Sequence, residues 1–211
     1  GRFLFGSPAH GGARVIREER RGYGAACKRG ADAASSREAL AKERVIVFID
    51  GDCSFDPRET EALLSPIFDR GAELVIGSRT KGRPEPGSLT LPQRLGNAWS
   101  CALMHALFGV CYSDLGPFRA IREESLSRLA LDDLGFGWTI QMQVRAARKR
   151  LSVAEVPVSC RRRAAGRSKV SGTIRGTFGA GAKFMRVILG EALDAARHGE
   201  KLGPHRVRRI Q

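Results

Sequence analysis

The sequence predicts an α/β domain with a mostly parallel central sheet flanked by helices. Three short runs rich in β-branched residues alternate with four stretches in which apolar residues recur at helical spacing. This alternation is typical of strand–helix–strand units, in which helices cover the faces of a sheet. With 211 residues, the chain is long enough to form one such domain with its own core.

The predicted strands span residues 44–50 (RVIVFID), 73–78 (ELVIGS) and 152–158 (SVAEVPV). The first is a nearly continuous apolar run, which is expected of a central strand buried on both faces. Residues 13–16 are predicted to form a further short strand. Three strands with intervening helices favour a layered α/β fold.

The predicted helices span residues 56–67, 92–108, 139–150 and 170–196. The first begins with an N-cap aspartate, Asp56, followed by Pro57 and Glu59. In the last helix the apolar residues fall broadly on one face, with Lys183 and Arg186 off it. Such a face packs on the domain core, or it lies on an anionic membrane surface.

Three segments are predicted along the chain: an irregular segment over 1–11, the main domain over 12–196 and a basic tail over 197–211. No complete strand–helix unit precedes Arg44, where the chain has only a Gly-rich stretch at 22–34. A parallel nucleotide-binding sheet makes its first ligand contacts from its first strand and turn. The domain is therefore expected to be incomplete at its N-terminus.

The net charge of +14 and the pI of about 10.6 predict anionic partners. Nucleic acid, an anionic membrane and phosphorylated small molecules all satisfy this charge. The sequence lacks a recognised nucleic-acid-binding motif and an aromatic platform, so nucleic acid is the less favoured alternative. Five cysteines without a Cys-x-x-Cys pair or a secretory signal predict reduced thiols in a cytoplasmic protein.

Two carboxylates, Asp50 and Asp52, follow the first predicted strand as Asp-Gly-Asp. In an open α/β sheet, ligands bind at the carboxyl ends of the strands. Two acids separated by one residue suit a hard cation such as Mg²⁺ or Mn²⁺ and the phosphates that accompany it. The same pattern is also common in ordinary turns after strands.

Two further segments carry chemistry. The loop at 161–169 (RRRAAGRSK) suits phosphate binding through charge-assisted hydrogen bonds, or it is a solvated basic loop. Asp114, in the segment YSDLGPFR, suits a general base or a sugar-hydroxyl ligand, or it caps a turn.

Two aromatic residues, Tyr23 and Trp138, are expected to pack in the core or a loop rather than stack on a ligand.

Taken in order, these segments resemble the family-2 glycosyltransferases, in particular the dolichyl- and polyprenyl-phosphate sugar transferases. The resemblance covers about residues 14–190 and rests on the ordered set RRGYGAACKRG, VIVFIDGDCSFDP, LVIGSR, QRLGN, YSDLGPFRAIR, FGWTIQMQVRAA, VAEVPV and RRRAAGRSKVSGT. It implies a GT-A fold and inverting transfer of a hexose from a nucleotide sugar of the UDP-glucose or GDP-mannose type. A polyprenyl or dolichyl phosphate is the implied acceptor, with peripheral contact at the inner membrane face.

The resemblance also implies roles for individual residues. Asp50 and Asp52 match the metal and donor motif, with Mg²⁺ or Mn²⁺ as cofactor. Asp114 matches the residue that orients or deprotonates the acceptor. The implied phosphate-binding residues are Arg79, Arg94, Arg163, Arg167, Ser168 and Lys169.

The sequence departs from the family pattern in two places. The N-terminal Pro-x-x-Asn-Glu and Asp-x-x-Ser-x-Asp patterns that bind the nucleotide base are absent. Gln141 stands where relatives usually carry Glu, so a charge expected near the acceptor is missing. An inactive remnant of the transferase fold is therefore an alternative to an active enzyme.

Overall fold

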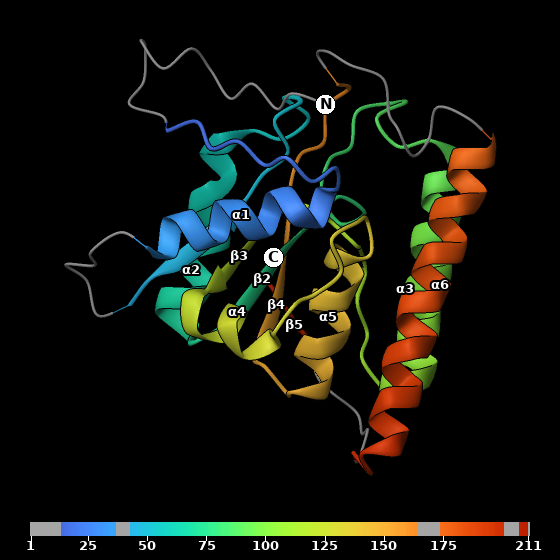
Figure 1. The fold of residues 1–211 in the computed structure, drawn as a ribbon. Coiled ribbons are helices and arrows are strands. Elements are labelled where there is room, and N and C mark those ends of the chain that lie inside the picture. Colours follow the sequence, from blue (N-terminus) through green and yellow to red (C-terminus); the bar gives the residue numbers. More distant parts are fainter. Residues whose placement is uncertain (1–13, 37–42, 164–173, 201–206, 211) are drawn as a thin grey trace.

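A computed structural model describes residues 14–36, 43–163, 174–200 and 207–210 of the chain. It shows a mixed five-stranded sheet with helices packed around it, which confirms the predicted α/β class (Figure 1). The strands are β1 (Val45–Phe48), β2 (Leu74–Ser78), β3 (Arg119–Arg122), β4 (Val153–Pro157) and β5 (Arg208–Arg209).

The strand order is β1-β3-β2-β4-β5. Strand β4 pairs in parallel with both β2 and β5, whereas β3 pairs antiparallel with β1 and β2. Strands β1, β2, β4 and β5 therefore run in one direction, and only β3 is reversed. As a result, the carboxyl ends of β1, β2 and β4 and the beginning of β3 lie at the same edge of the sheet.

Strands β1, β2 and β4 lie within the three predicted runs, but β1 is not the buried central strand that was expected. Val45, Ile46 and Val47 are half-buried and only Phe48 is buried. Among the described residues, β1 pairs with β3 alone, which places it at the sheet edge. The reversed strand β3 was not predicted, because RAIR has arginines at both ends and is too short to show an apolar pattern.

Four helices confirm the predicted ones with small shifts at their ends, and a 3-10 turn, η1 (Pro57–Glu59), precedes the first of them. The N-terminus of the helix after β2 is fixed by a capping box between Thr90 and Gln93. Two helices were not predicted, one before β1 and one after β3. The helices are α1 (Tyr23–Ser35), α2 (Thr60–Arg70), α3 (Leu91–Phe108), α4 (Glu123–Leu129), α5 (Trp138–Arg148) and α6 (Ile174–Arg197).

The Gly-rich stretch at 22–34 folds into helix α1. Its glycines allow close backbone contact: a Cβ at Gly22 would lie 2.0 Å from the Leu134 carbonyl oxygen, and one at Gly24 would lie 2.1 Å from that of Asp133. The amide of Gly24 donates to the Gly135 carbonyl at 3.1 Å. Glycine here permits packing against the loop before α5.

The sheet separates two apolar clusters. Adjacent β2 residues alternate between them, because successive side chains of a strand point to opposite faces. Leu74 and Ile76 join the larger cluster, under α3, α5 and α6, whereas Val75 joins the smaller one, under α2. Trp138 is 2% exposed in the larger cluster, where its ring centroid lies 4.9 Å from that of Phe48, which confirms its predicted core role.

Two terminal segments differ from the prediction. Residues 14–16 have no regular secondary structure, so the short strand predicted at 13–16 does not form over them. Near the other end, Val207 is buried and β5 pairs with β4, so this part of the predicted basic tail belongs to the sheet. Residues 1–11 of the predicted irregular segment lie outside the described residues.

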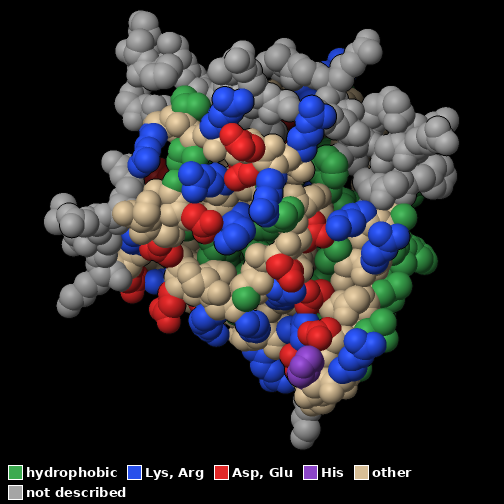
Figure 2. Space-filling model, viewed as in Figure 1, with side chains coloured by type: hydrophobic (Ala, Val, Ile, Leu, Met, Phe, Trp, Pro, Cys, Tyr) green, Lys and Arg blue, Asp and Glu red, His purple; other side chains and the backbone are tan. Residues whose placement is uncertain are grey.

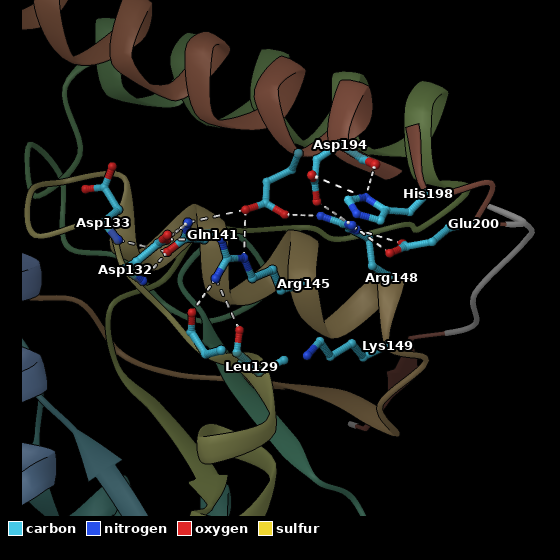
Figure 3. Close-up of polar contacts among 12 residues, drawn as sticks. Leu129, Asp132, Asp133, Gln141, Arg145, Arg148, Lys149, Asp194, His198 and Glu200 are labelled. Atoms are coloured by element: carbon cyan, nitrogen blue, oxygen red, sulfur yellow. Dashed lines mark hydrogen bonds and ion pairs between the residues drawn. The ribbon is translucent and has the colours of Figure 1, made fainter. Parts of the chain in front are cut away.

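Helix α6 is held against α5 by a polar cluster (Figure 3). Its Glu191, 7% exposed, accepts hydrogen bonds from Arg145 Nε at 2.7 Å and from Arg148 Nη1. Arg148 also pairs with Asp194 at 2.9 Å and with Glu200 at 2.7 Å. Hydrogen bonding to Arg148 lowers the pKa of both Asp194 and Glu200.

Across the described part of the chain, none of the helices has the length and apolarity needed to cross a bilayer.

Candidate active site

Residues far apart in sequence meet at the edge where β1, β2 and β4 end and β3 begins. Asp50 and Asp52 follow β1, Arg79 follows β2, and Arg163 lies in the segment after β4. Asp114 lies in the segment that leads into the reversed strand β3. The direction of the strands alone explains this convergence, as expected for a ligand site in an α/β sheet.

Arg79 and Asp114 form the most completely buried ion pair of this edge. Asp114 is 1% exposed and accepts from the Arg79 backbone amide at 2.7 Å, from Nε at 2.9 Å and from Nη2 at 2.7 Å. Both carboxylate oxygens are therefore bound by one arginine in a bidentate arrangement. Burial lowers the pKa of the Arg79 guanidinium, but the hydrogen bonds and charge of Asp114 outweigh this and leave that pKa raised.

The segment that carries Asp114 is fixed from α3 and α5. Asn97 of α3 donates to the Ser113 carbonyl at 3.2 Å and accepts from the Leu115 amide at 2.8 Å. Gln143 of α5, fully buried, donates to the carbonyl of Asp114 at 3.0 Å. The Asp114 backbone is therefore bracketed on both sides by side chains of two helices.

The same segment is also held against the sheet. Arg119 is 1% exposed and donates to the carbonyls of Gly116 and Thr139, the latter at 3.0 Å. Burial lowers the pKa of Arg119 to about 10. A Cβ at Gly116 would lie 2.1 Å from the Gly77 carbonyl oxygen, so only glycine allows the segment to approach β2 this closely.

A buried carboxylate that the sequence analysis missed, Glu155 of β4, completes this support. It is fully buried and accepts from the Ser113 amide and hydroxyl, both at 2.8 Å. Lys81 Nζ donates at 2.7 Å to Oε2, the oxygen that also accepts from the Ser113 hydroxyl. The Ser78 hydroxyl lies 2.8 Å from that of Ser113. A charged residue at the centre of an apolar strand, as in VAEVPV, is the signal that points to such a partnered site.

The two carboxylates after β1 lie in a basic environment. Asp52 pairs with Arg163 Nε at 3.0 Å and accepts from the Ser54 amide at 3.0 Å. Burial, followed by the negative charge of Asp52, raises the pKa of Asp50. The positive charge of Arg163, a hydrogen bond from Tyr23 and the positive charge of Arg79 act in the opposite direction. The mutual repulsion of the carboxylates is the electrostatic condition that a divalent cation relieves.

These residues fit a Mg²⁺ or Mn²⁺ ion as two hard oxygen donors. Within the described ranges there is no group of three or more His, Cys, Asp or Glu side chains suited to a metal. A cation at Asp50 and Asp52 would therefore take its remaining ligands from phosphate oxygens and water, as Mg²⁺ commonly does.

Of the other predicted phosphate-binding residues, the structure describes only some. Arg94 lies exposed in the first turn of α3, and its side chain takes no part in the Arg79–Asp114 pair. Arg167, Ser168 and Lys169 lie outside the described residues. The beginning of the basic loop is anchored, because Arg161 pairs with Asp56 at 3.0 Å.

Gln141 occupies a structural position rather than an open one. It is 6% exposed, and its side-chain oxygen accepts from the amides of Asp132 and Asp133, both at 3.0 Å. Its side-chain amide donates to Asp132 Oδ1 at 2.6 Å and to Glu191 Oε1 at 3.3 Å (Figure 3). An amide suits this position, since it must accept from two N–H groups and donate to two carboxylates.

Comparison with protein families adds a sequence relationship to this geometry. Residues 7–130 match the profile of the family described as Glycosyl transferase family 2. An uncharacterized glycosyltransferase of Mycobacterium tuberculosis is 36% identical over 185 residues, covering 85% of this chain and 78% of the relative. Polyprenol monophosphomannose synthase of Mycolicibacterium smegmatis is 35% identical over 137 residues, covering 61% of this chain and 50% of that protein.

The fold is similar to that of a solved enzyme. Glucosyl-3-phosphoglycerate synthase of Mycobacterium tuberculosis, in its complex with uridine diphosphate, superposes with a TM-score of 0.58 at 20% identity. The match covers 86% of this chain and 61% of the solved one. At this identity the likeness establishes the fold, which agrees with the GT-A fold expected from the sequence.

Proposed function

The chain belongs to glycosyl transferase family 2, and from this premise we propose that it transfers a hexose from a nucleotide-diphosphate sugar to a polyprenyl-type phosphate. The observation that carries the proposal is the meeting of Asp50, Asp52, Arg79, Asp114 and Arg163 at one sheet edge. A carboxylate pair beside two arginines provides separate places for a cation and for anionic phosphates.

On the donor side, Asp50 and Asp52 would hold Mg²⁺ or Mn²⁺ against the diphosphate. When bound, the cation supplies positive charge that stabilises the diphosphate as it departs. Arg163 pairs with Asp52 and its side chain is 45% exposed, so it can exchange this partner for a phosphate oxygen. Its guanidinium then adds charge-assisted hydrogen bonds to the leaving group.

On the acceptor side, the geometry favours Arg79 as the phosphate-binding group. Asp114 uses both oxygens to hold Arg79, whose side chain remains 17% exposed. A phosphate monoester is already largely deprotonated near neutral pH, because its second pKa is about 6. Its anionic oxygen can attack the anomeric carbon without a base, while the bond from that carbon to the diphosphate breaks and the diphosphate leaves with the bonding electrons. Attack opposite the leaving group inverts the anomeric centre.

Two relationships support this choice of substrates. A relative of 35% identity is named for a polyprenol monophosphomannose product, and the solved neighbour binds uridine diphosphate.

The experiment is a transfer assay with radiolabelled UDP-glucose or GDP-mannose, a polyprenyl phosphate and Mg²⁺ or Mn²⁺. We expect a lipid-extractable sugar product that disappears with EDTA and in Asp52→Ala. Asp69→Ala, which changes an exposed carboxylate on α2, is the matched control and retains activity. Absence of product with every donor and metal, together with no nucleotide binding, would favour the inactive remnant.

A further inference from the structure

Helix α3 exposes a continuous apolar stripe that the active site does not use. Leu91, Leu95 and Trp99 recur at every fourth position and are 68%, 63% and 64% exposed. Ala98 and Ala102 are exposed on the same side of the helix. The opposite side is ordinary core, since Met104 is fully buried and Phe108 is 2% exposed. The helix is thus apolar on two faces, only one of which packs on the domain.

Helix α6 extends this stripe into a wider surface. It lies alongside α3 and packs against it (Figure 1). The Trp99 indole nitrogen lies 3.2 Å from the sulfur of Met185. Leu189 and Leu193 are 44% and 61% exposed, whereas their neighbours Ile188 and Ala195 are fully buried. The core packing predicted for α6 is therefore present at Ile188 and Ala195, and a second apolar face remains outside it.

We call this surface the α3–α6 ridge and define it as Leu91, Leu95, Trp99, Leu189 and Leu193. Apolar side chains are visible along the edge of the molecule that α6 borders (Figure 2). Scattered exposed leucines are common on proteins, but a set aligned on two packed helices marks an interaction surface.

The charges around the ridge are almost entirely positive. Helix α3 contains no acidic residue, and Arg94 lies exposed between Leu91 and Leu95. On α6, Arg186 and Arg197 are exposed, and neither they nor Arg94 form an ion pair within the described residues. The acidic residues described on α6, Glu191 and Asp194, are both paired with Arg148.

We propose that the α3–α6 ridge docks on an anionic lipid bilayer, with its leucines and Trp99 in the headgroup boundary and its arginines on lipid phosphates. Apolar residues flanked by unpaired cations are the pattern of helices that lie in a membrane interface. Trp suits this depth, since its ring is apolar and its N–H is polar. A second copy seated face to face would bring two sets of unpaired arginines together, which opposes that arrangement.

Helix α3 links the ridge to the candidate site. Asn97, on the inward side of α3, binds the backbone on both sides of Asp114. Docking of α3 would therefore place the Arg79–Asp114 pair near the surface from which a lipid phosphate emerges. This consequence rests on the proposed function, whereas the binding of the ridge to lipid does not.

The test measures co-sedimentation of the full chain with vesicles of phosphatidylcholine alone or mixed with phosphatidylglycerol. We expect binding to the anionic vesicles only. Leu91→Gln with Leu95→Gln should lower the partition constant by about tenfold or more, because two leucines leave the interface. Arg186→Gln and Arg197→Gln should each lower it about fivefold, from the attraction of one cation to anionic lipid.

Matched controls separate the ridge from general surface effects. Phe68→Gln removes an apolar side chain that is 58% exposed on α2, and Arg29→Gln removes an exposed cation on α1; neither should change binding. The two tryptophans differ in exposure, at 64% for Trp99 and 2% for Trp138, so a blue shift of emission on vesicle addition reports Trp99. Trp99→Phe should abolish that shift.

Three results would overturn the inference. These are absence of binding to anionic vesicles, equal binding by the ridge variants, and a lipid-free dimer in sedimentation velocity that Leu91→Gln with Leu95→Gln dissociates. The last would assign the ridge to a second copy. Ridge-dependent vesicle binding by a chain without transferase activity would sustain this inference and reject the proposed function alone.

Discussion

Arg79 binds Asp114 with its backbone amide and two side-chain nitrogens, and so uses both oxygens of a carboxylate that is 1% exposed. The pair joins the end of β2 to the segment before β3. It also orients the Arg79 guanidinium, which we propose binds the acceptor phosphate. The three hydrogen bonds make the two residues one functional unit.

The Arg79–Asp114 pair predicts different kinetic effects for substitutions of its two residues. Arg79→Lys keeps the charge but loses the bidentate fork, so kcat/KM for the acceptor should fall about ten- to hundredfold, equivalent to about 1.5–3 kcal/mol. Asp114→Asn keeps one oxygen as acceptor and should mainly raise the acceptor KM. A loss of kcat in Asp114→Asn with unchanged KM would instead identify Asp114 as a base.

The carboxylates after β1 predict metal-dependent nucleotide binding. Asp52→Ala should abolish the gain in nucleoside-diphosphate affinity that Mn²⁺ provides, because one of two oxygen donors is removed. Calorimetry with and without Mn²⁺ measures this gain, and Asp69→Ala serves as the control. An unchanged gain in Asp52→Ala would exclude this pair as the cation site.

Glu155 is predicted to act as a positioning residue for Asp114. Glu155→Gln removes an acceptor shared by Ser113 and Lys81, so kcat should fall while donor affinity stays unchanged. The free energy of unfolding should fall by about 1.5–3 kcal/mol, the usual size of a charged hydrogen bond. Adding Lys81→Met should restore stability without restoring kcat. If it restored both, Glu155 would contribute only to stability.

Gln141→Glu tests the departure from the family pattern. The substitution places a carboxylate beside Asp132 and Glu191, where the present amide donates to both. We expect a loss of about 2 kcal/mol in urea unfolding, from repulsion and a lost donor. Glu124→Gln, at an exposed position of α4, is a control for a single charge change. Equal stability with higher activity would show that the position belongs to the acceptor site.

The basic loop is predicted to bind the donor. Arg167→Ala or Lys169→Ala should each weaken nucleotide-sugar binding by roughly 1.5–3 kcal/mol, because each removes a charge-assisted phosphate contact. Titration of a fluorescent nucleotide sugar measures the change, with Arg29→Ala as the control. Parental affinity in both loop variants would make the loop an ordinary surface feature.

Local patterns in the chain were sufficient for the fold class, three strands and four helices, because apolar periodicity and capping residues act within a few positions. They also indicated Asp50, Asp52 and Asp114 as candidate site residues, whereas Arg79 was implied only by the resemblance to the family. Helix α1 escaped prediction because its glycines serve contacts with residues 133–135 that no local pattern reveals. Strand β3 was not predicted because its four residues form a strand only by pairing with β1 and β2.

The partners of each side chain required the folded chain. Asp114 meets Arg79 across 35 positions and Ser113 meets Glu155 across 42, and such separations are closed only by sheet topology. The same holds for Gln141, whose amide is satisfied by a loop and by α6. Leu95 and Ile188 are both aliphatic, yet one is 63% exposed and the other fully buried, because packing between helices selects which apolar face meets the core.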